Sequence, residues 1–438
     1  MKKKGGAGRI AGVLLLLFAV CAFAVFASGT KISFIENYSY NFKMNILALT
    51  RHFGIELSEP VQEFLQDLST PEPAAADGAA DYQPDNQQET DTDAEQARAE
   101  DIPDVEFTEP EPENKETKNY PVALEDASSA QYERYRGYLL CVNETAVMAF
   151  DTDGKSLWAV GIHMSNPILQ VNGNYYMVAE RGGKKIMAFD GKRLLFETQA
   201  DGNIKSASIS SNGDIAVVSD KEYYKGAVIV INKNGDRIFS WNSGADAVID
   251  ADISAGSRRL AVSLLNTEDG ALSRVMLFDI SKTESYAQAE FSGSVVFDVR
   301  FLGEVLNVFA DDKICGVSMK GKILWESDYT ERQLLHYCTD SSGYKLIMAN
   351  NHNVPELEVL TGRGKQKSLI AAETAPEHMD ICSGMIAYNS GRELKFSAVS
   401  GKRTKVHTCT RDIHDIYIID NNNVAVVYNS GLDFIKFK

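Results

Sequence analysis

The chain has 438 residues, of which 44% are hydrophobic and 24% charged, and its formal net charge is −17 at pH 7. This composition is ordinary for a globular protein, and the length allows more than one domain. Nucleic acid is disfavoured as a partner, because the C-terminal part of the chain is near neutral rather than basic and is expected to lie outside the cytoplasm.

The N-terminus has the pattern of a membrane anchor. Four basic residues within positions 1–9 precede the segment from Ile10 to Ala27, which is uncharged and contains 11 Leu, Ile, Val or Phe residues. Such residues each favour insertion by about 0.3 to 0.6 kcal/mol, and basic flanks stay in the cytoplasm. We therefore predict a cytoplasmic tail (1–9), a transmembrane signal anchor (10–27) in contact with the bilayer, and an extracytoplasmic remainder. A signal peptide cleaved after Ala27 is the alternative.

Residues 28–70 are predicted to be a juxtamembrane helical segment. Apolar residues cluster between Phe42 and Leu49, and a second apolar series with helical spacing follows Ser58. The segment is interpreted as a hairpin on the bilayer or packed on itself. Self-association or docking of a partner is the other interpretation.

Residues 71–118 contain most of the negative charge. They hold 16 Asp and Glu residues against Arg98, Lys115 and Lys118, a net charge of −13, so the rest of the chain carries only −4. With several prolines and few apolar residues, this stretch cannot bury enough surface to offset the entropy of ordering. We predict a disordered acidic linker.

Two interleaved sets of turn residues recur about every 40 residues through residues 119–438. One set marks a turn after an inner strand: Gly137, Gly173, Gly213, Gly256, Gly303, Gly343, Gly384 and Asn422. The other marks a later turn in the same unit: Gly154, Gly191, Gly235, Ser281, Gly321, Gly362 and Gly401. Short strands rich in Val, Ile and Phe between such turns are typical of four-stranded units, and their repetition indicates an all-β protein, a β-propeller.

The two sets differ in number, and the difference predicts how the ring closes. The last unit ends after a third strand near Phe437, and the stretch from Tyr120 to Glu125 resembles a lone strand. We predict eight blades with strand-exchange closure, in which the early strand completes the last blade and protects its edge. Seven blades are the alternative, if residues 128–135 contain no true inner strand.

Two further patterns concern packing and binding. Large residues recur four positions after the second set of turn residues, at Trp158, Leu195, Phe239 and Trp325, and are predicted to wedge between blades. Three connections, Lys221–Lys225, Asn266–Leu272 and Asn351–Pro355, are expected to be long and to lie on one face. Such loops often bind partners, although insertion without selection explains them equally well.

No catalytic, cofactor-binding or metal-binding residue can be assigned. The seven histidines lack metal-ligand spacing, and the residues from Asp151 to Gly154 are interpreted as a turn rather than a calcium loop. No phosphate-binding loop, dinucleotide fingerprint or nucleophile elbow occurs. Five cysteines in the C-terminal bulk lack close pairing, so we expect buried thiols rather than a disulfide framework: Cys141, Cys315, Cys338, Cys382 and Cys409.

The stretches Ala149–Trp158 and Met319–Trp325 resemble the repeats of PQQ-type and WD40-like propellers. The whole layout of basic terminus, anchor, helical stretch, acidic linker and propeller is similar to an uncharacterised family of bacterial membrane-anchored propeller proteins. The resemblance implies a fold but no quinone site and no activity.

The sequence therefore favours a non-enzymatic, membrane-anchored extracytoplasmic propeller that binds or scaffolds other proteins of the cell envelope. The alternative is an enzyme, or a binder of carbohydrate or another small ligand, with its site at the central channel.

Overall fold

A computed structural model describes residues 122–124, 127–268, 270–352, 354–372 and 374–437. The predictions for the tail, the anchor, the juxtamembrane segment and the linker lie outside these residues. Within the part described, no helix is long and apolar enough to cross a bilayer.

The described residues form eight antiparallel sheets of four strands each. Seven sheets consist of consecutive strands. Sheet 1 is β2 (Gln131–Tyr135), β3 (Tyr138–Val142), β4 (Ala146–Phe150) and β5 (Ser156–Gly161); sheet 2 is β6 (Pro167–Asn172), β7 (Tyr175–Glu180), β8 (Lys185–Asp190) and β9 (Arg193–Gln199); sheet 3 is β10 (Ile204–Ile209), β11 (Ile215–Ser219), β12 (Gly226–Ile231) and β13 (Arg237–Ser243); sheet 4 is β14 (Ala247–Ile253), β15 (Arg259–Asn266), β16 (Leu272–Asp279) and β17 (Ser285–Ser292).

The remaining sheets continue this order. Sheet 5 is β18 (Val296–Leu302), β19 (Val305–Ala310), β20 (Lys313–Val317) and β21 (Ile323–Asp328); sheet 6 is β22 (Gln333–Thr339), β23 (Lys345–Asn351), β24 (Val354–Leu360) and β25 (Gln366–Ala371); sheet 7 is β26 (Met379–Cys382), β27 (Met385–Ser390), β28 (Glu393–Ala398) and β29 (Lys405–Thr408); sheet 8 is β30 (Asp415–Ile418), β31 (Asn423–Tyr428), β32 (Gly431–Lys436) and β1 (Val122–Ala123).

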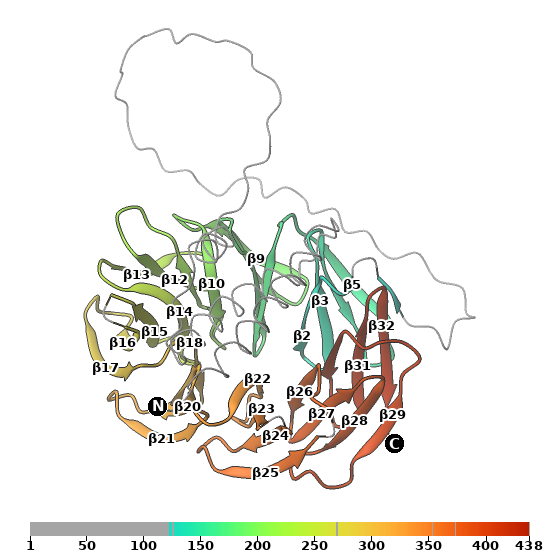
Figure 1. Ribbon diagram of the computed structural model, residues 1–438. Helices are drawn as coiled ribbons and strands as arrows, with labels where there is room; N and C mark the ends of the chain where they lie inside the picture. The colour runs from blue at the N-terminus through green and yellow to red at the C-terminus, as the bar shows by residue number, and fades with distance from the viewer. Residues whose placement is uncertain (1–121, 125–126, 269, 353, 373, 438) are drawn as a thin grey trace, which may run out of the picture. The chain divides into compact units, whose positions relative to one another are not determined.

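The sheets follow one another around a ring, with the first strand of each sheet innermost (Figure 1). The predicted eight-bladed propeller is confirmed, and the seven-bladed alternative is wrong because β2 is a true inner strand. Strand direction alternates within each sheet, so the first and third turns of every sheet share one face of the ring, the turn face. The second turns and the connections between sheets share the opposite face, the loop face.

The ring closes as predicted, by exchange of a strand. In β1, Val122 pairs with Leu432 and Ala123 with Gly431 of β32, and the Leu124 N–H donates to the Ser430 carbonyl at 3.2 Å. The described strand is shorter than the predicted stretch from Tyr120 to Glu125. Pairing between the two ends of the propeller means that the last sheet does not expose a full edge strand.

Both sets of predicted turn residues lie on the turn face, but two of the predicted glycines do not adopt the left-handed backbone conformation. In sheet 4 it is Ser257 (φ 54°) rather than Gly256, and in sheet 6 it is Gly364 (φ 70°) rather than Gly362. Which residue adopts φ > 0 depends on turn length and type, and a repeat pattern locates a turn only to within a residue or two.

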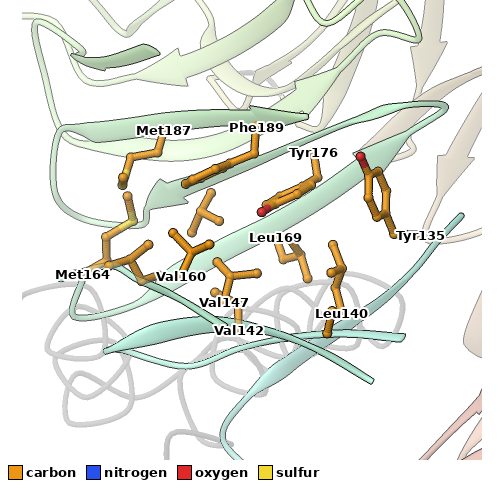
Figure 2. Packing of buried hydrophobic residues seen from close by; sticks show 13 residues of the cluster. Tyr135, Leu140, Val142, Val147, Val160, Met164, Leu169, Tyr176, Met187 and Phe189 are labelled. Atoms are coloured by element: carbon orange, nitrogen blue, oxygen red, sulfur yellow. The ribbon is translucent and has the colours of Figure 1, made fainter. Parts of the chain in front are cut away.

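The core lies between neighbouring sheets. In the cluster between sheets 1 and 2, the Tyr176 ring stacks on Phe189 with centroids 4.9 Å apart, and Tyr135 meets Tyr176 edge-on at 5.3 Å (Figure 2). Trp158 also stacks on Tyr176 at 6.4 Å. Trp158 of sheet 1 thus packs against sheet 2, which confirms its predicted role as a wedge.

A second contact ties each outer strand to the next sheet. In several sheets the third turn lies against the outer strand of the preceding sheet: a Cβ built on Gly364 lies 2.2 Å from Trp325 of β21, and one on Gly154 lies 3.2 Å from Val122 of β1. Residues 99–438 form one compact unit, and the ring of eight sheets lies within it.

Candidate functional site

The inner strands surround the central channel with charged side chains. Six are acidic and three basic: Glu133, Asp250, Asp252, Asp298, Asp380, Asp415, Arg134, Lys205 and Arg300. Burial raises the pKa of Glu133 in sheet 1, and the charges of Arg134 and of Arg300 in sheet 5, on the opposite side of the eight-membered ring, oppose this rise. Acidic residues outnumber basic ones on the inner strands.

A repeated β-bulge helps to position these side chains. In four consecutive inner strands the register with the second strand shifts at the same place, just before Ser206, Asp250, Asp298 and His336. A bulge inserts one extra residue and so re-aims the side chains that follow it. The first residue after the bulge therefore has the same position in each of these four neighbouring sheets, and in all four it is polar.

Several carboxylates connect adjacent inner strands. Asp250 and Asp252 accept hydrogen bonds from the backbone N–H groups of Val299 and Phe301, at 3.1 and 2.6 Å. Asp380 accepts one from the Ile418 N–H at 2.7 Å. These inner-strand N–H groups are satisfied by side chains rather than by a ladder, so the acids have a structural role.

Two arginines neutralise part of the charge. Arg134 Nη1 lies 2.5 Å from Asp380 Oδ2, and this ion pair joins sheets 1 and 7 past sheet 8. Arg300 Nε lies 2.7 Å from Asp298 Oδ2, which also accepts a hydrogen bond from the Tyr337 hydroxyl. Each arginine pairs with one acid, which leaves the other carboxylates of the channel without a full countercharge.

The remaining carboxyl groups hold their protons unusually strongly. Burial, together with the charge of Asp298, raises the pKa of Asp250 well above its usual value. Burial raises the pKa of Asp252 to about 6, although the Phe301 N–H opposes this shift. Burial likewise raises the pKa of Glu133 and Asp415. Those of these carboxyl groups that are ionised can bind a cationic group.

The Asp252→Asn variant tests this description of the channel. The pKa of Asp252 is higher in the folded state than in the unfolded state. Between about pH 4 and pH 6 the carboxyl group is therefore protonated in the folded chain and ionised in the unfolded chain. The contribution of this carboxyl group to stability is present below pH 4 and lost as the pH rises through 6. We expect the variant to gain stability relative to the original chain over that interval, in denaturant titrations at successive pH values. A difference that does not change with pH would contradict the raised pKa.

Three of the seven histidines gather near the loop face, which sequence spacing did not predict. The rings of His378 and His414 lie 6.1 Å apart, and His378 Nδ1 lies 3.8 Å from Asp415 Oδ1. Burial, reinforced by His414, lowers the pKa of His378 to about 4, and burial also lowers that of His336. Across the described ranges, no group of three or more His, Cys, Asp or Glu residues could hold a metal ion.

The predicted turn at Asp151 and the cysteines are structural. Asp151 Oδ1 accepts hydrogen bonds from the N–H groups of Asp153 and Lys155 at 3.0 and 2.9 Å, which makes it a turn rather than a calcium loop. All five cysteines of the propeller are free thiols; Cys141, Cys315 and Cys409 are buried as predicted, whereas Cys338 and Cys382, on the inner strands of adjacent sheets, are only partly buried.

The loop face presents two long connections of the three that were predicted. Residues 220–225 and 267–271 separate the second and third strands of sheets 3 and 4. The third prediction is wrong, because β23 continues to Asn351 and β24 begins at Val354, which leaves a two-residue hairpin. The pairing of β23 with β24 continues to Asn351 and Val354, so Pro355, which pairs with Asn350, lies within a strand rather than in the loop.

The first of these loops holds the most exposed aromatic residue among those described. Tyr223 is 93% exposed with φ 65°, and Tyr224 is 47% exposed. A bulky residue with positive φ is strained, and such strain is kept where surrounding structure holds the loop in shape. The Asp220 N–H donates to the Asn203 carbonyl at 2.9 Å and the Lys225 N–H to the Ser243 carbonyl at 2.8 Å, so both ends of the loop are fixed.

The ring of eight sheets, the strand exchange and the charged channel define a closed, eight-bladed β-propeller. The chain belongs to a family of unknown function, DUF5711, whose model matches residues 113–437. No curated protein matches it.

Solved propellers resemble this chain in fold. The computationally designed Ika8 protein is 11% identical with a TM-score of 0.54, over 73% of this chain and 97% of that one. The C-terminal WD40 domain of Sif2 is 8% identical with a TM-score of 0.52, over 73% and 96%. BamB from Moraxella catarrhalis is 11% identical with a TM-score of 0.48, over 73% and 99%. Identities this low show the fold alone.

Proposed function

We propose that the protein is a membrane-anchored, extracytoplasmic propeller that binds or scaffolds proteins of the cell envelope. The observation that carries this proposal is the loop at residues 220–225, which presents Tyr223 and Tyr224 to solvent in a fixed conformation. Tyrosine is enriched at protein interfaces because it contributes a large contact area at low entropic cost. The similarity to a WD40 domain agrees with a protein-binding role.

The proposal is tested by photo-crosslinking in cells with the full chain. A photo-reactive phenylalanine analogue at Tyr224 is expected to give one reproducible protein adduct. The same analogue at Tyr286 is the matched control, because Tyr286 is also 47% exposed but lies on an outer strand near the turn face. Adducts of the same kind at both positions, or at neither, would contradict a specific protein site on the loop face.

The Tyr223→Ala/Tyr224→Ala variant makes a quantitative prediction. Loss of two interface tyrosines should weaken the captured complex at least tenfold, since each such residue contributes about 1–2 kcal/mol or more. Stability of the propeller should stay unchanged, because both side chains are exposed. Dissociation constants for the variant and for Tyr286→Ala, measured against the crosslinked protein, check both expectations.

Topology and the channel alternative need separate experiments. Protease added to intact protoplasts should degrade the propeller if it is extracytoplasmic, and protection would overturn the orientation. The charged channel is the observation that favours the second candidate, a small-ligand site. A saturable increase in melting temperature with one glycan or cationic ligand, lost in Asp298→Asn, would support that candidate over a protein scaffold.

A further inference from the structure

The third turns of sheets 5, 6 and 7, with the start of the outer strand that follows each, are uniformly basic. Residues 318–324, 361–369 and 399–406 contain no Asp or Glu. Their basic residues are all exposed: Lys320, Lys322, Arg363, Lys365, Lys367, Lys402, Arg403 and Lys405. We call these three stretches the basic arc. It carries eight positive charges in a propeller that is net negative.

The corresponding third turns of sheets 1 to 4 show that this charge is not a general property of the repeat. Residues 151–158, 190–195, 232–239 and 279–286 contain six acidic and six basic residues. Every one of these four turns has at least one Asp. The basic arc is therefore a local departure from a balanced pattern.

The three turns are neighbours in space. A Cβ on Gly364 in the sheet 6 turn would lie 2.2 Å from Trp325 on β21, and one on Gly401 in the sheet 7 turn would lie 3.3 Å from Ile370 on β25. Each turn thus rests on the outer strand of the sheet before it. Figure 1 shows β21, β25 and β29 following one another along the rim, from orange to red.

The basic arc also exposes aliphatic side chains. Ile323, Leu324, Leu369 and Val406 are about half exposed, and all four lie at or near the start of these same outer strands. They are four of the eight exposed large aliphatic residues in the described part of the chain. Exposed apolar side chains that gather beside one another can mark a surface that contacts a protein or a membrane.

We infer that the basic arc docks the propeller on an anionic phospholipid surface. Lysine and arginine near such a surface bind its headgroups, and adjacent aliphatic side chains enter the boundary with the acyl chains. A bilayer is continuous, so it can contact charges spread over three sheets at once. Six of the eight cations are lysines and the three stretches expose no aromatic residue, which disfavours nucleic acid, for which stacking is typical. The inference stands independently of the predicted anchor.

Sedimentation with vesicles tests this inference on residues 99–438, the compact unit, so that the predicted anchor cannot contribute. Binding is expected to vesicles of equal parts phosphatidylcholine and phosphatidylglycerol, to weaken with salt, and to be absent with phosphatidylcholine alone. Each basic residue near an anionic bilayer is worth about fivefold in affinity. The Lys322→Ala/Lys365→Ala/Lys367→Ala/Lys402→Ala variant should therefore bind at least tenfold more weakly.

The matched control removes four exposed lysines from the balanced turns on the same face: Lys155, Lys192, Lys233 and Lys282, each to Ala. The control should retain nearly all of the binding. Leu324→Ser/Leu369→Ser should weaken binding without changing its dependence on salt. Equal loss in the control, no loss in the arc variant, or binding to nucleic acid or polyglutamate but not to vesicles would each overturn the inference.

Discussion

Replacing Gly431 with alanine is expected to lower the free energy of unfolding by about 3 kcal/mol, because the substitution drives the two ends of the propeller apart. A Cβ at Gly431 would lie 2.2 Å from the carbonyl oxygen of Val122 in β1. The clash is with a backbone atom, which cannot rotate away as the end of a flexible side chain can. To relieve it, β1 must move away from β32. Denaturant titration of residues 99–438 measures the loss.

Gly161 provides a matched control for this substitution. It also lies in a strand, its φ is not positive, and nothing lies within 4 Å of a Cβ placed there. Gly161→Ala should leave stability unchanged or raise it slightly by reducing the entropy of the unfolded chain. Amide hydrogen exchange adds a local measurement, since faster exchange should appear in β32 of Gly431→Ala. Equal stability of the two variants would contradict closure through β1.

Ring closure could be predicted because it follows from counting turns. Eight turns of one kind against seven of the other leave one strand missing, and Val122 pairs with Leu432 where the missing strand belongs. Each turn is predicted from a few neighbouring residues, and the pattern repeats in every sheet. Placing one turn two residues away, as with Gly362 instead of Gly364, therefore does not change the number of turns.

The channel could not be predicted for the opposite reason. Arg134 and Asp380 are 246 residues apart and meet only because the ring closes and brings sheets 1 and 7 to either side of sheet 8. Nothing in the residues around Asp252 distinguishes it from a solvated strand acid. Its raised pKa is a property of the closed ring, and so is the proximity of His378 to His414.

Lys345 is a second residue whose environment could not be predicted from the sequence. Its burial has a large effect on the free energy of unfolding. It follows a Ser-Ser-Gly turn, where a lysine is normally solvated, yet it is 0% exposed. Its Nζ donates to the Gly343 carbonyl at 3.0 Å and lies 4.9 Å from the centre of the Trp325 ring. Burial lowers the pKa of Lys345 to about 8, although Asp340 opposes the shift.

Lys345→Met is therefore expected to stabilise the propeller at pH 7, by about 1–3 kcal/mol. Below pH 8 the ammonium is charged in both states, so the folded state bears the full cost of burying it. Between about pH 8 and 10.5 the unfolded chain holds a proton that the folded chain lacks, and stability of the original chain rises with pH. The advantage of the variant should therefore shrink over this interval and disappear above it.

Denaturant titrations at pH 7, 8, 9 and 10 measure this difference, and comparison at each pH cancels the titration of tyrosines and cysteines elsewhere. Lys233→Met removes an exposed lysine of the sheet 3 turn and should show no dependence on pH over the same interval. A variant that is less stable at every pH would mean that the Gly343 hydrogen bond and the Trp325 ring outweigh burial. In that case the ammonium between sheets 5 and 6 would be a stabilising contact, and the low pKa of Lys345 would be wrong.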